Sequence, residues 1–100
     1  MKNKEKEGVI VTGCLGGIGQ AINFELKKND NFYIIGLDLE ENPNPTTLKN
    51  IDKYVSCDLN NPLMIFNTIE FIFSKYNRIN HLINNAGIMR NDMILNTHWR

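Results

Sequence analysis

The chain has 100 residues, of which 42% are hydrophobic and 22% are charged, so it can form one small domain with a modest core. Lysine plus arginine and aspartate plus glutamate number 11 each, which gives a net charge of zero. This balance provides no basic field to hold nucleic acid, and no apolar stretch approaches the roughly 20 residues that cross a bilayer. The composition therefore argues against a disordered tail, a nucleic-acid-binding protein and a membrane protein.

The cysteines and the N-terminal stretch indicate where the protein is found. Residues 1–7 are polar, lead directly into a strand-like run, and lack the apolar segment of a signal peptide. Cys14 and Cys57 do not make a disulfide scaffold, and neither has the spacing of a metal ligand. We expect both cysteines to be small buried residues, no metal site, and a reducing, cytoplasmic location.

The first half of the chain alternates between strand-like and helix-like patterns. The run Val9–Val11 is apolar on both faces, which predicts a buried parallel strand before a glycine-rich turn. A helix is expected over 17–28. The residues of its expected apolar stripe are Ile18, Ala21, Ile22 and Leu26. The second strand is expected over 32–37 and should end at Asp38.

Prolines and asparagines divide the second half. A loop is expected over 42–45, because proline disfavours helix in the residue before it, and one helical turn over 46–51 follows. A third strand over 53–57 ends at Asp58. An asparagine cap and a proline at 61–62 then predict a long helix. Its expected apolar face contains Leu63, Ile65, Phe66, Ile69, Ile72, Phe73 and Tyr76.

A fourth strand is expected over 81–83, directly before the polar turn Asn84–Gly87. The order of elements is then strand, helix, strand, loop, strand, helix and strand. This alternation predicts an α/β fold with a parallel sheet and right-handed crossovers.

A glycine-rich loop, Thr12–Gly19, lies between the first predicted strand and helix. Small residues let backbone N–H groups approach a pyrophosphate, and a helix N-terminus adds the positive end of its dipole. A tight turn that binds nothing is the alternative interpretation. Because the pattern predicts both the strand before the loop and the helix after it, we favour a phosphate-binding loop.

Polar residues also follow the other three predicted strands. Asp38 lies about 20 residues beyond the loop, where an acid can hydrogen-bond the adenosine ribose of NAD. Its charge, with those of Glu40 and Glu41, would repel the 2′-phosphate of NADP. Asp58–Leu59 lies at the ligand-binding rim of a parallel sheet, although a simple turn explains it equally well. Asn84–Gly87 either approaches a ligand, ties strands together, or is only an asparagine-rich turn.

These four motifs together resemble the short-chain dehydrogenase/reductase family. They are Thr-Gly-x-x-x-Gly-x-Gly, the acid after strand two, Asp-Leu after strand three and Asn-Asn-Ala-Gly after strand four, in the family's order and spacing. The resemblance covers residues 9–99, and the tail after Gly87 is similar to the 3-oxoacyl-[acyl-carrier-protein] reductases. It implies a truncated Rossmann-like, doubly wound sheet of about four strands in the order 3-2-1-4. We expect a single partial NAD(P)-binding domain over 1–100, with a polar tail at 1–7.

The resemblance also implies which residues of the loop and the second strand hold a nicotinamide dinucleotide. The loop residues around the cofactor would be Gly13, Leu15, Gly16 and Ile18. Gly17 and Gly19 would allow close packing. Asp38 would hold the adenosine ribose. Gly16 stands where NADP-preferring relatives often carry arginine, so it agrees with Asp38 in favouring NAD over NADP.

The later strands contribute the remaining implied contacts. Asp58 would hydrogen-bond the adenine amino group, and Leu59 would lie beside the adenine ring. Asn85, Ala86 and Gly87 would line the ribose side of the nucleotide. Asn84 would support the sheet.

The reaction centre of the family is a serine, a tyrosine and a lysine four residues after the tyrosine, all expected beyond residue 100. No lysine lies four residues after Tyr33, Tyr54 or Tyr76, so we expect no catalytic residue in this chain. The resemblance implies an oxidoreductase that transfers hydride between the nicotinamide and a carbonyl or alcohol substrate. The alternative is a truncated, non-catalytic nucleotide-binding module or remnant. The family's oligomer interface would lie outside the chain, which alone should be marginally stable.

Overall fold

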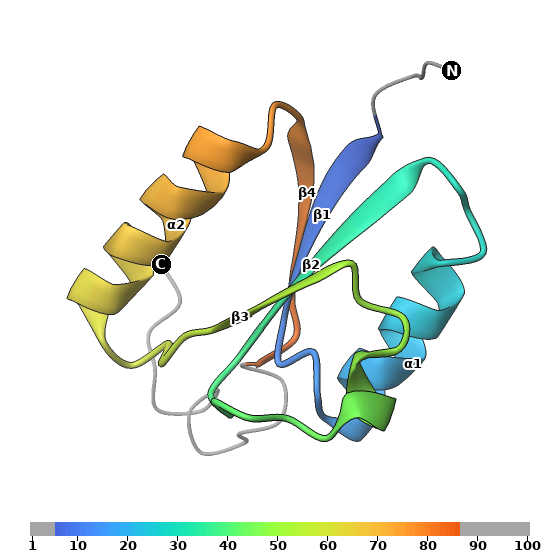
Figure 1. Ribbon diagram of the computed structural model, residues 1–100, viewed down its shortest axis with the longest axis horizontal. Helices are drawn as coiled ribbons and strands as arrows, with labels where there is room; N and C mark the ends of the chain where they lie inside the picture. The colour runs from blue at the N-terminus through green and yellow to red at the C-terminus, as the bar shows by residue number, and fades with distance from the viewer. Residues whose placement is uncertain (1–5, 87–100) are drawn as a thin grey trace.

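A four-stranded parallel sheet with helices on both faces forms the structure, a computed structural model that describes residues 6–86 (Figure 1). The strands are β1 (Glu7–Thr12), β2 (Phe32–Asp38), β3 (Lys53–Ser56) and β4 (Ile79–Asn84). Their order is β3-β2-β1-β4, which confirms the predicted Rossmann-like, doubly wound arrangement. No helix within this described part is long and apolar enough to cross a membrane.

The strand boundaries differ from the prediction where hydrogen bonds extend or shorten the ladder. Strand β1 includes Glu7, which was expected in the tail, because its N–H donates to Asn31 O at 2.7 Å. Strand β4 begins at Ile79, earlier than expected, because this residue pairs with Gly8 of β1. Strand β3 ends at Ser56, one residue earlier than expected.

Three helical segments connect the strands: α1 (Gly17–Leu26), the 3-10 segment η1 (Pro45–Leu48) and α2 (Pro62–Lys75). Helix α1 ends two residues before the predicted position. The Asn61 side chain accepts a hydrogen bond from Met64 N at 3.1 Å, which confirms the predicted cap of α2. Asn44 caps η1 in the same way, by accepting from Thr46 N at 3.0 Å.

The core has two layers, one on each face of the sheet. Successive residues of a strand point to opposite faces, so a strand that is apolar throughout supplies both layers. The layer on the α1 side contains Val9, Val11, Cys14 and Ile34. The layer on the α2 side contains Ile10, Ile35, Leu37 and Ile72. The two helices therefore cover opposite faces, as expected (Figure 1).

Both predicted helical stripes were wrong in part. In α1, Ile18 and Ala21 are exposed, while Gly19 and Asn23 are buried. The helix packs against the glycine loop through Gly19, and this contact turns Ile18 toward solvent.

Helix α2 is apolar around more than half of its circumference, and the sheet covers only one side. Ile72 packs against the sheet in the core layer on this side, and Thr68 is also buried. Three residues of the predicted apolar face are exposed instead: Leu63, Phe66 and Phe73. The period of the sequence located the helix correctly, but it did not indicate which side of the helix packs.

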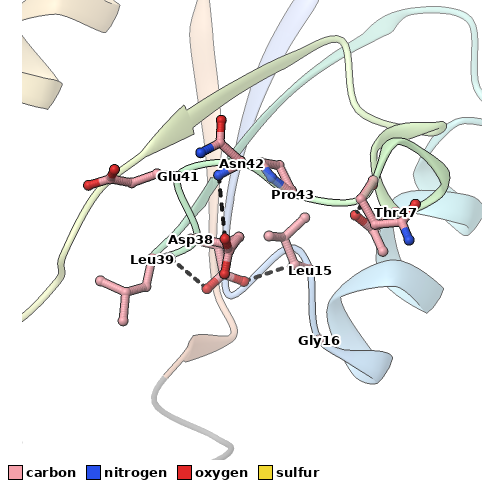
Figure 2. A pocket seen from close by; sticks show the side chains of 10 residues that line it. Leu15, Gly16, Asp38, Leu39, Glu41, Asn42, Pro43 and Thr47 are labelled. Atoms are coloured by element: carbon pink, nitrogen blue, oxygen red, sulfur yellow. Dashed lines mark hydrogen bonds between the residues drawn. The ribbon is translucent and has the colours of Figure 1, made fainter.

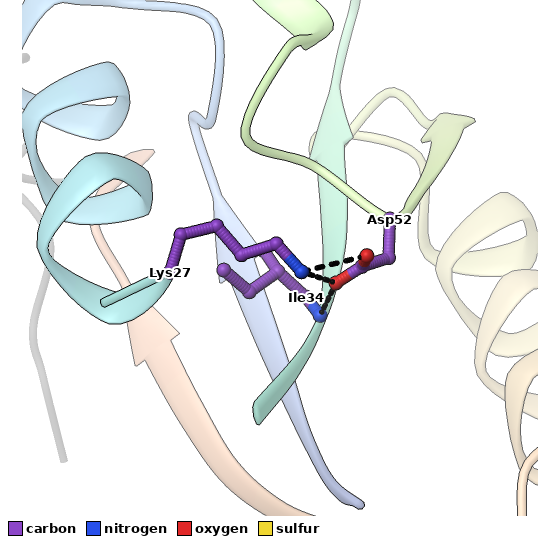
Figure 3. A network of polar contacts seen from close by, with 3 residues as sticks. All are labelled: Lys27, Ile34 and Asp52. Atoms are coloured by element: carbon purple, nitrogen blue, oxygen red, sulfur yellow. Dashed lines mark hydrogen bonds and ion pairs between the residues drawn. The ribbon is translucent and has the colours of Figure 1, made fainter. Parts of the chain in front are cut away.

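A polar network ties the end of α1 to the start of β3 (Figure 3). Asp52 Oδ2 accepts hydrogen bonds from Ile34 N at 2.7 Å and from Lys27 Nζ at 2.8 Å. Asp52 N also donates to Ile34 O at 2.9 Å. The Asp52 side chain thereby satisfies a buried strand N–H that β3 does not reach.

Replacing Asp52 with alanine is expected to lower the free energy of unfolding by about 1–3 kcal/mol, because Ile34 N–H loses its acceptor. Asp52→Asn keeps an acceptor oxygen for Ile34 N–H and weakens only the ion pair with Lys27, whose side chains are 29% and 23% exposed, so its cost should be about 1 kcal/mol or less. Urea denaturation measures both values. Equal stabilities for the alanine variant and the wild type would show that Ile34 N–H does not depend on Asp52.

Candidate functional site

The ends of the parallel strands and the loops that follow them meet at one edge of the sheet, the lower edge in Figure 1. Two adjoining open clefts lie there. The first, of about 820 Å³, lies between the glycine loop and the segment after β2; its lining includes Leu15, Gly16, Asp38, Glu40, Glu41 and Thr47. The second, of about 290 Å³, is lined by Gly13, Gly16, Asp38, Leu39, Cys57, Asp58, Leu59, Asn60 and Ala86. Both clefts share Gly16, Asp38 and Leu39.

The structure brings most of the predicted site residues to these two clefts, but not all of them. Those that line a cleft are Gly13, Leu15, Gly16, Asp38, Asp58, Leu59 and Ala86. The predicted residues that line neither cleft are Gly17, Ile18, Gly19 and Asn85. Gly87 lies outside the described residues.

Asp38 ends β2, and its carboxylate accepts hydrogen bonds from two backbone N–H groups (Figure 2). Its Oδ2 accepts from Leu15 N at 2.9 Å, and its Oδ1 accepts from Leu39 N at 2.7 Å. Glu40 and Glu41 line the same cleft, which is therefore acidic. An anionic group placed beside Asp38 would meet three carboxylates.

The glycine loop is hydrogen-bonded to β2 and to the residue that follows β4. Gly13 has a φ of 65°, in the left-handed region that favours glycine. Its N–H donates to Leu37 O at 2.9 Å, and its carbonyl accepts from Asn85 Nδ2 at 3.0 Å. The Asn85 side chain is thus buried behind the loop. It lines neither cleft, although it was expected to line the ribose side of the nucleotide.

Thr12 joins the ends of β1 and β4. Its Oγ1 donates to Asn84 Oδ1 at 3.0 Å and accepts from Ala86 N at 3.1 Å. This confirms that Asn84 supports the sheet. Sequence reasoning gave Thr12 no role of its own, although a hydroxyl that ends an apolar strand was an available signal.

The N-terminus of α1 is open toward the clefts. Its N-cap residue, Gly16, has no side chain that could accept a hydrogen bond from the first turn, and this turn contains no acidic residue. The expected close packing at Gly17 was wrong, because a Cβ there would meet nothing within 4 Å. At Gly19 close packing is confirmed, since a Cβ would lie 2.1 Å from Gly13 O. Ile18, between them, is 47% exposed.

Asp58 makes a turn and also lines a cleft. Its Oδ1 accepts from Asn60 N at 2.9 Å, which makes the turn before α2. It also lines the second cleft together with Leu59. The turn that Asp58 makes is therefore shown, and its place in the cleft leaves the carboxylate able to meet a ligand there.

Both cysteines near the clefts are buried thiols. Cys14 and Cys57 are free and buried, as predicted. Burial, and secondly the Asp38 charge, raise the pKa of the Cys14 thiol to about 12, so it stays protonated at neutral pH. Within residues 6–86 no group of three histidine, cysteine or acidic residues could hold a metal ion.

Comparison with known proteins identifies the family. The model of the short chain dehydrogenase family matches residues 7–99. The chain belongs to this family. The 3-oxoacyl-[acyl-carrier-protein] reductase FabG of Buchnera aphidicola subsp. Baizongia pistaciae is 34% identical to it over 103 aligned positions, and the alignment covers 96% of this chain and 40% of the relative. The chain thus spans about two fifths of that short-chain dehydrogenase relative.

Solved structures agree with this family. A short chain dehydrogenase family protein from Francisella tularensis subsp. tularensis SCHU S4 superimposes with a TM-score of 0.64 and 28% identity, over 82% of this chain and 31% of the other. A short chain dehydrogenase from Mycobacterium smegmatis gives a TM-score of 0.68 over 83% of this chain and 38% of the other. At 23% identity, the second likeness shows the fold alone.

Family membership places the chain in an oxidoreductase family with a Rossmann-like fold and implies a nicotinamide dinucleotide cofactor. The site fits such a group. The clefts carry no side chain at Gly13 or Gly16, the α1 N-terminus is uncapped beside them, and the Asp38 carboxylate lies in both. This combination suits a pyrophosphate flanked by a ribose.

Proposed function

We propose that this chain binds a nicotinamide dinucleotide, NAD in preference to NADP, at the carboxyl edge of its sheet. It would be the cofactor-binding part of an oxidoreductase that transfers hydride between the nicotinamide and a carbonyl or alcohol carbon. One observation carries the proposal: residues from the loop and from the ends of the other three strands line the same cleft. They are Gly13 and Gly16, then Asp38, then Asp58 and Leu59, and finally Ala86.

The glycine loop would hold the pyrophosphate. The open N-terminus of α1 supplies the positive end of a helix dipole, and Gly16 lets a phosphate approach the backbone. Gly13 provides the turn, and Gly19 lets the helix pack closely under the loop. Leu15, which lines the first cleft, would contact the dinucleotide from one side.

Two further residues would complete this half of the site at the start of α1. Ile18 is exposed in the first turn and would contact the dinucleotide beside the loop. Gly17 leaves open space there, so a phosphate would meet no side chain.

The acids would hold the adenosine half. Asp38 accepts hydrogen bonds, so its carboxylate suits the two ribose hydroxyls of NAD. With Glu40 and Glu41 in the same cleft, a 2′-phosphate would be repelled. Asp58 would accept from the adenine amino group, and Leu59 would contact the ring.

The residues that follow β4 would contribute the remaining contacts with the nucleotide. Ala86 lines the second cleft and would contact the ribose of the nucleotide, and the family motif extends this proposed role to Gly87. Asn85 would support the site indirectly, because its hydrogen bond to Gly13 O holds the glycine loop in place.

The bound dinucleotide supplies the hydride chemistry, and the residues of this chain bind and orient it. We take 1–100 as one partial dinucleotide-binding domain. Because the chain spans 40% of its relative, the reaction is proposed for the whole protein. The name of that relative, a 3-oxoacyl-[acyl-carrier-protein] reductase, supports a carbonyl compound as the substrate class.

Titration of the 100-residue chain with NADH, followed by calorimetry and by nicotinamide fluorescence, tests the proposal. We expect saturable one-to-one binding, with weaker binding of NADPH. Gly16→Glu should abolish it, because a carboxylate at the N-cap of α1 would repel the pyrophosphate. Phe66→Glu adds the same charge at an exposed position on α2 and should leave binding unchanged. No saturation at millimolar NADH, or equal losses in the two variants, would refute the proposal.

A further inference from the structure

Two amide side chains of α1 reach back to the glycine loop. Asn23 Nδ2 donates to Cys14 O at 3.1 Å, and Gln20 Nε2 donates to Leu15 O at 2.7 Å. The two amides therefore hold two successive carbonyls of the loop. Asn23 is 1% exposed and lines neither of the two clefts, so it cannot touch a ligand there.

The peptide group between Cys14 and Leu15 is held at both ends. Its carbonyl accepts from Asn23, and its N–H donates to Asp38 Oδ2 at 2.9 Å. In a planar trans peptide the C=O and N–H bonds point in opposite directions. A carbonyl fixed on Asn23 therefore keeps the Leu15 N–H directed at Asp38.

We propose that Asn23 is a positioning residue that orients the Asp38 carboxylate through the Cys14–Leu15 peptide, and thereby sets the discrimination between NAD and NADP. This inference rests on the proposed function of Asp38. One oxygen of Asp38 depends on this peptide, and the other accepts from Leu39 N at 2.7 Å. Loss of the first contact leaves the carboxylate free to rotate about the second, away from a bound ribose.

The surroundings of Asn23 indicate a role other than packing. Its Oδ1 is buried and has no hydrogen-bond partner within the described chain. A buried, unsatisfied amide oxygen costs free energy, so an apolar side chain of similar size would pack at least as well against the core. What an apolar side chain cannot supply is the donor for Cys14 O.

The test compares Asn23→Leu with the wild-type chain. We expect little change in the urea midpoint, because removal of the unsatisfied oxygen offsets the lost hydrogen bond. We expect amide hydrogen exchange at Leu15 to accelerate by about tenfold or more, since its N–H is no longer held on Asp38. The ratio of NADPH to NADH dissociation constants should fall by about tenfold, as expected for one charged hydrogen bond.

Gln20→Met is the matched control. Gln20 holds the next carbonyl, that of Leu15, whose peptide N–H belongs to Gly16 and donates to Gly13 O at 3.3 Å. This variant should change exchange at Gly16 and leave both Leu15 exchange and the dissociation-constant ratio near their wild-type values. A merely structural role of α1 side chains would make the two variants alike.

The outcomes separate this inference from the proposed function. Absence of NADH binding by the wild type would refute the proposed function and the discrimination with it, while Leu15 exchange would still measure the positioning. If the wild type binds NADH but Asn23→Leu leaves Leu15 exchange or the ratio unchanged, the positioning role is overturned. If Asn23→Leu does not fold, Asn23→Ala is measured by the same two readouts under native conditions.

Discussion

Replacing Gly19 with alanine is expected to destabilise the chain more than any other single methyl group added to the glycine loop or the first turn of α1. An alanine Cβ would lie 2.1 Å from Gly13 O and 2.9 Å from Cys14 Cα. Both neighbours are backbone atoms, so no side chain can move aside, and α1 must shift away from the loop. Overpacking of this kind costs about 1–3 kcal/mol or more, a large share of the stability of a small domain.

Gly17 offers a control in the same turn of the same helix. A Cβ there meets nothing within 4 Å, so Gly17→Ala should be neutral or stabilise α1 by up to about 1 kcal/mol. Thermal unfolding followed by circular dichroism compares the two. Gly19→Ala should also weaken NADH binding, because its shift of α1 displaces the loop. An equal melting temperature for Gly19→Ala and the wild type would contradict the packing argument.

The fold could be predicted because each of its local signals is strong. Val9–Val11 is apolar on both faces, which is typical of a strand covered by helices on both sides. Asn61 and Pro62 specify the start of α2 through a cap and a fixed φ. Once the strands alternate with helical segments, right-handed crossovers leave few arrangements, and the observed order is among them.

The packed faces of the helices could not be predicted as well. Phe66 and Phe73 fit the apolar period of α2, yet both are exposed, because the sequence pattern was broader than the surface that the sheet offers. In α1, the contact at Gly19 decides the orientation of the helix. A glycine contributes nothing to an apolar period, so the sequence pattern placed Ile18 inside instead.

The same distinction applies to the candidate site. The convergence of Asp38, Asp58 and Ala86 follows from topology, since residues after parallel strands lie at one edge. The direction of each side chain does not follow from topology. Asn85 turns behind the loop and Asn23 hydrogen-bonds Cys14 O, and both contacts depend on distances that no sequence spacing encodes.

Replacing Asp38 with alanine is expected to reverse or abolish the preference for NADH over NADPH. The carboxylate is the proposed acceptor for the adenosine ribose, and hydrogen bonds to a charged group contribute about 1.5–3 kcal/mol. The dissociation constant of NADH should therefore rise by about tenfold to a hundredfold. That of NADPH should fall, because a carboxylate that repels the 2′-phosphate is removed.

A neighbouring acid separates this specific role from the general charge of the cleft. Glu41 lines the same cleft but lies beyond the end of β2, so Glu41→Gln should strengthen NADPH binding slightly and leave NADH binding unchanged. Competition titrations at constant ionic strength measure both dissociation constants, since salt screens the repulsion. If Asp38→Ala binds NADH as tightly as the wild type, the ribose is held elsewhere. The acids of the first cleft would then contribute only electrostatic repulsion of the 2′-phosphate.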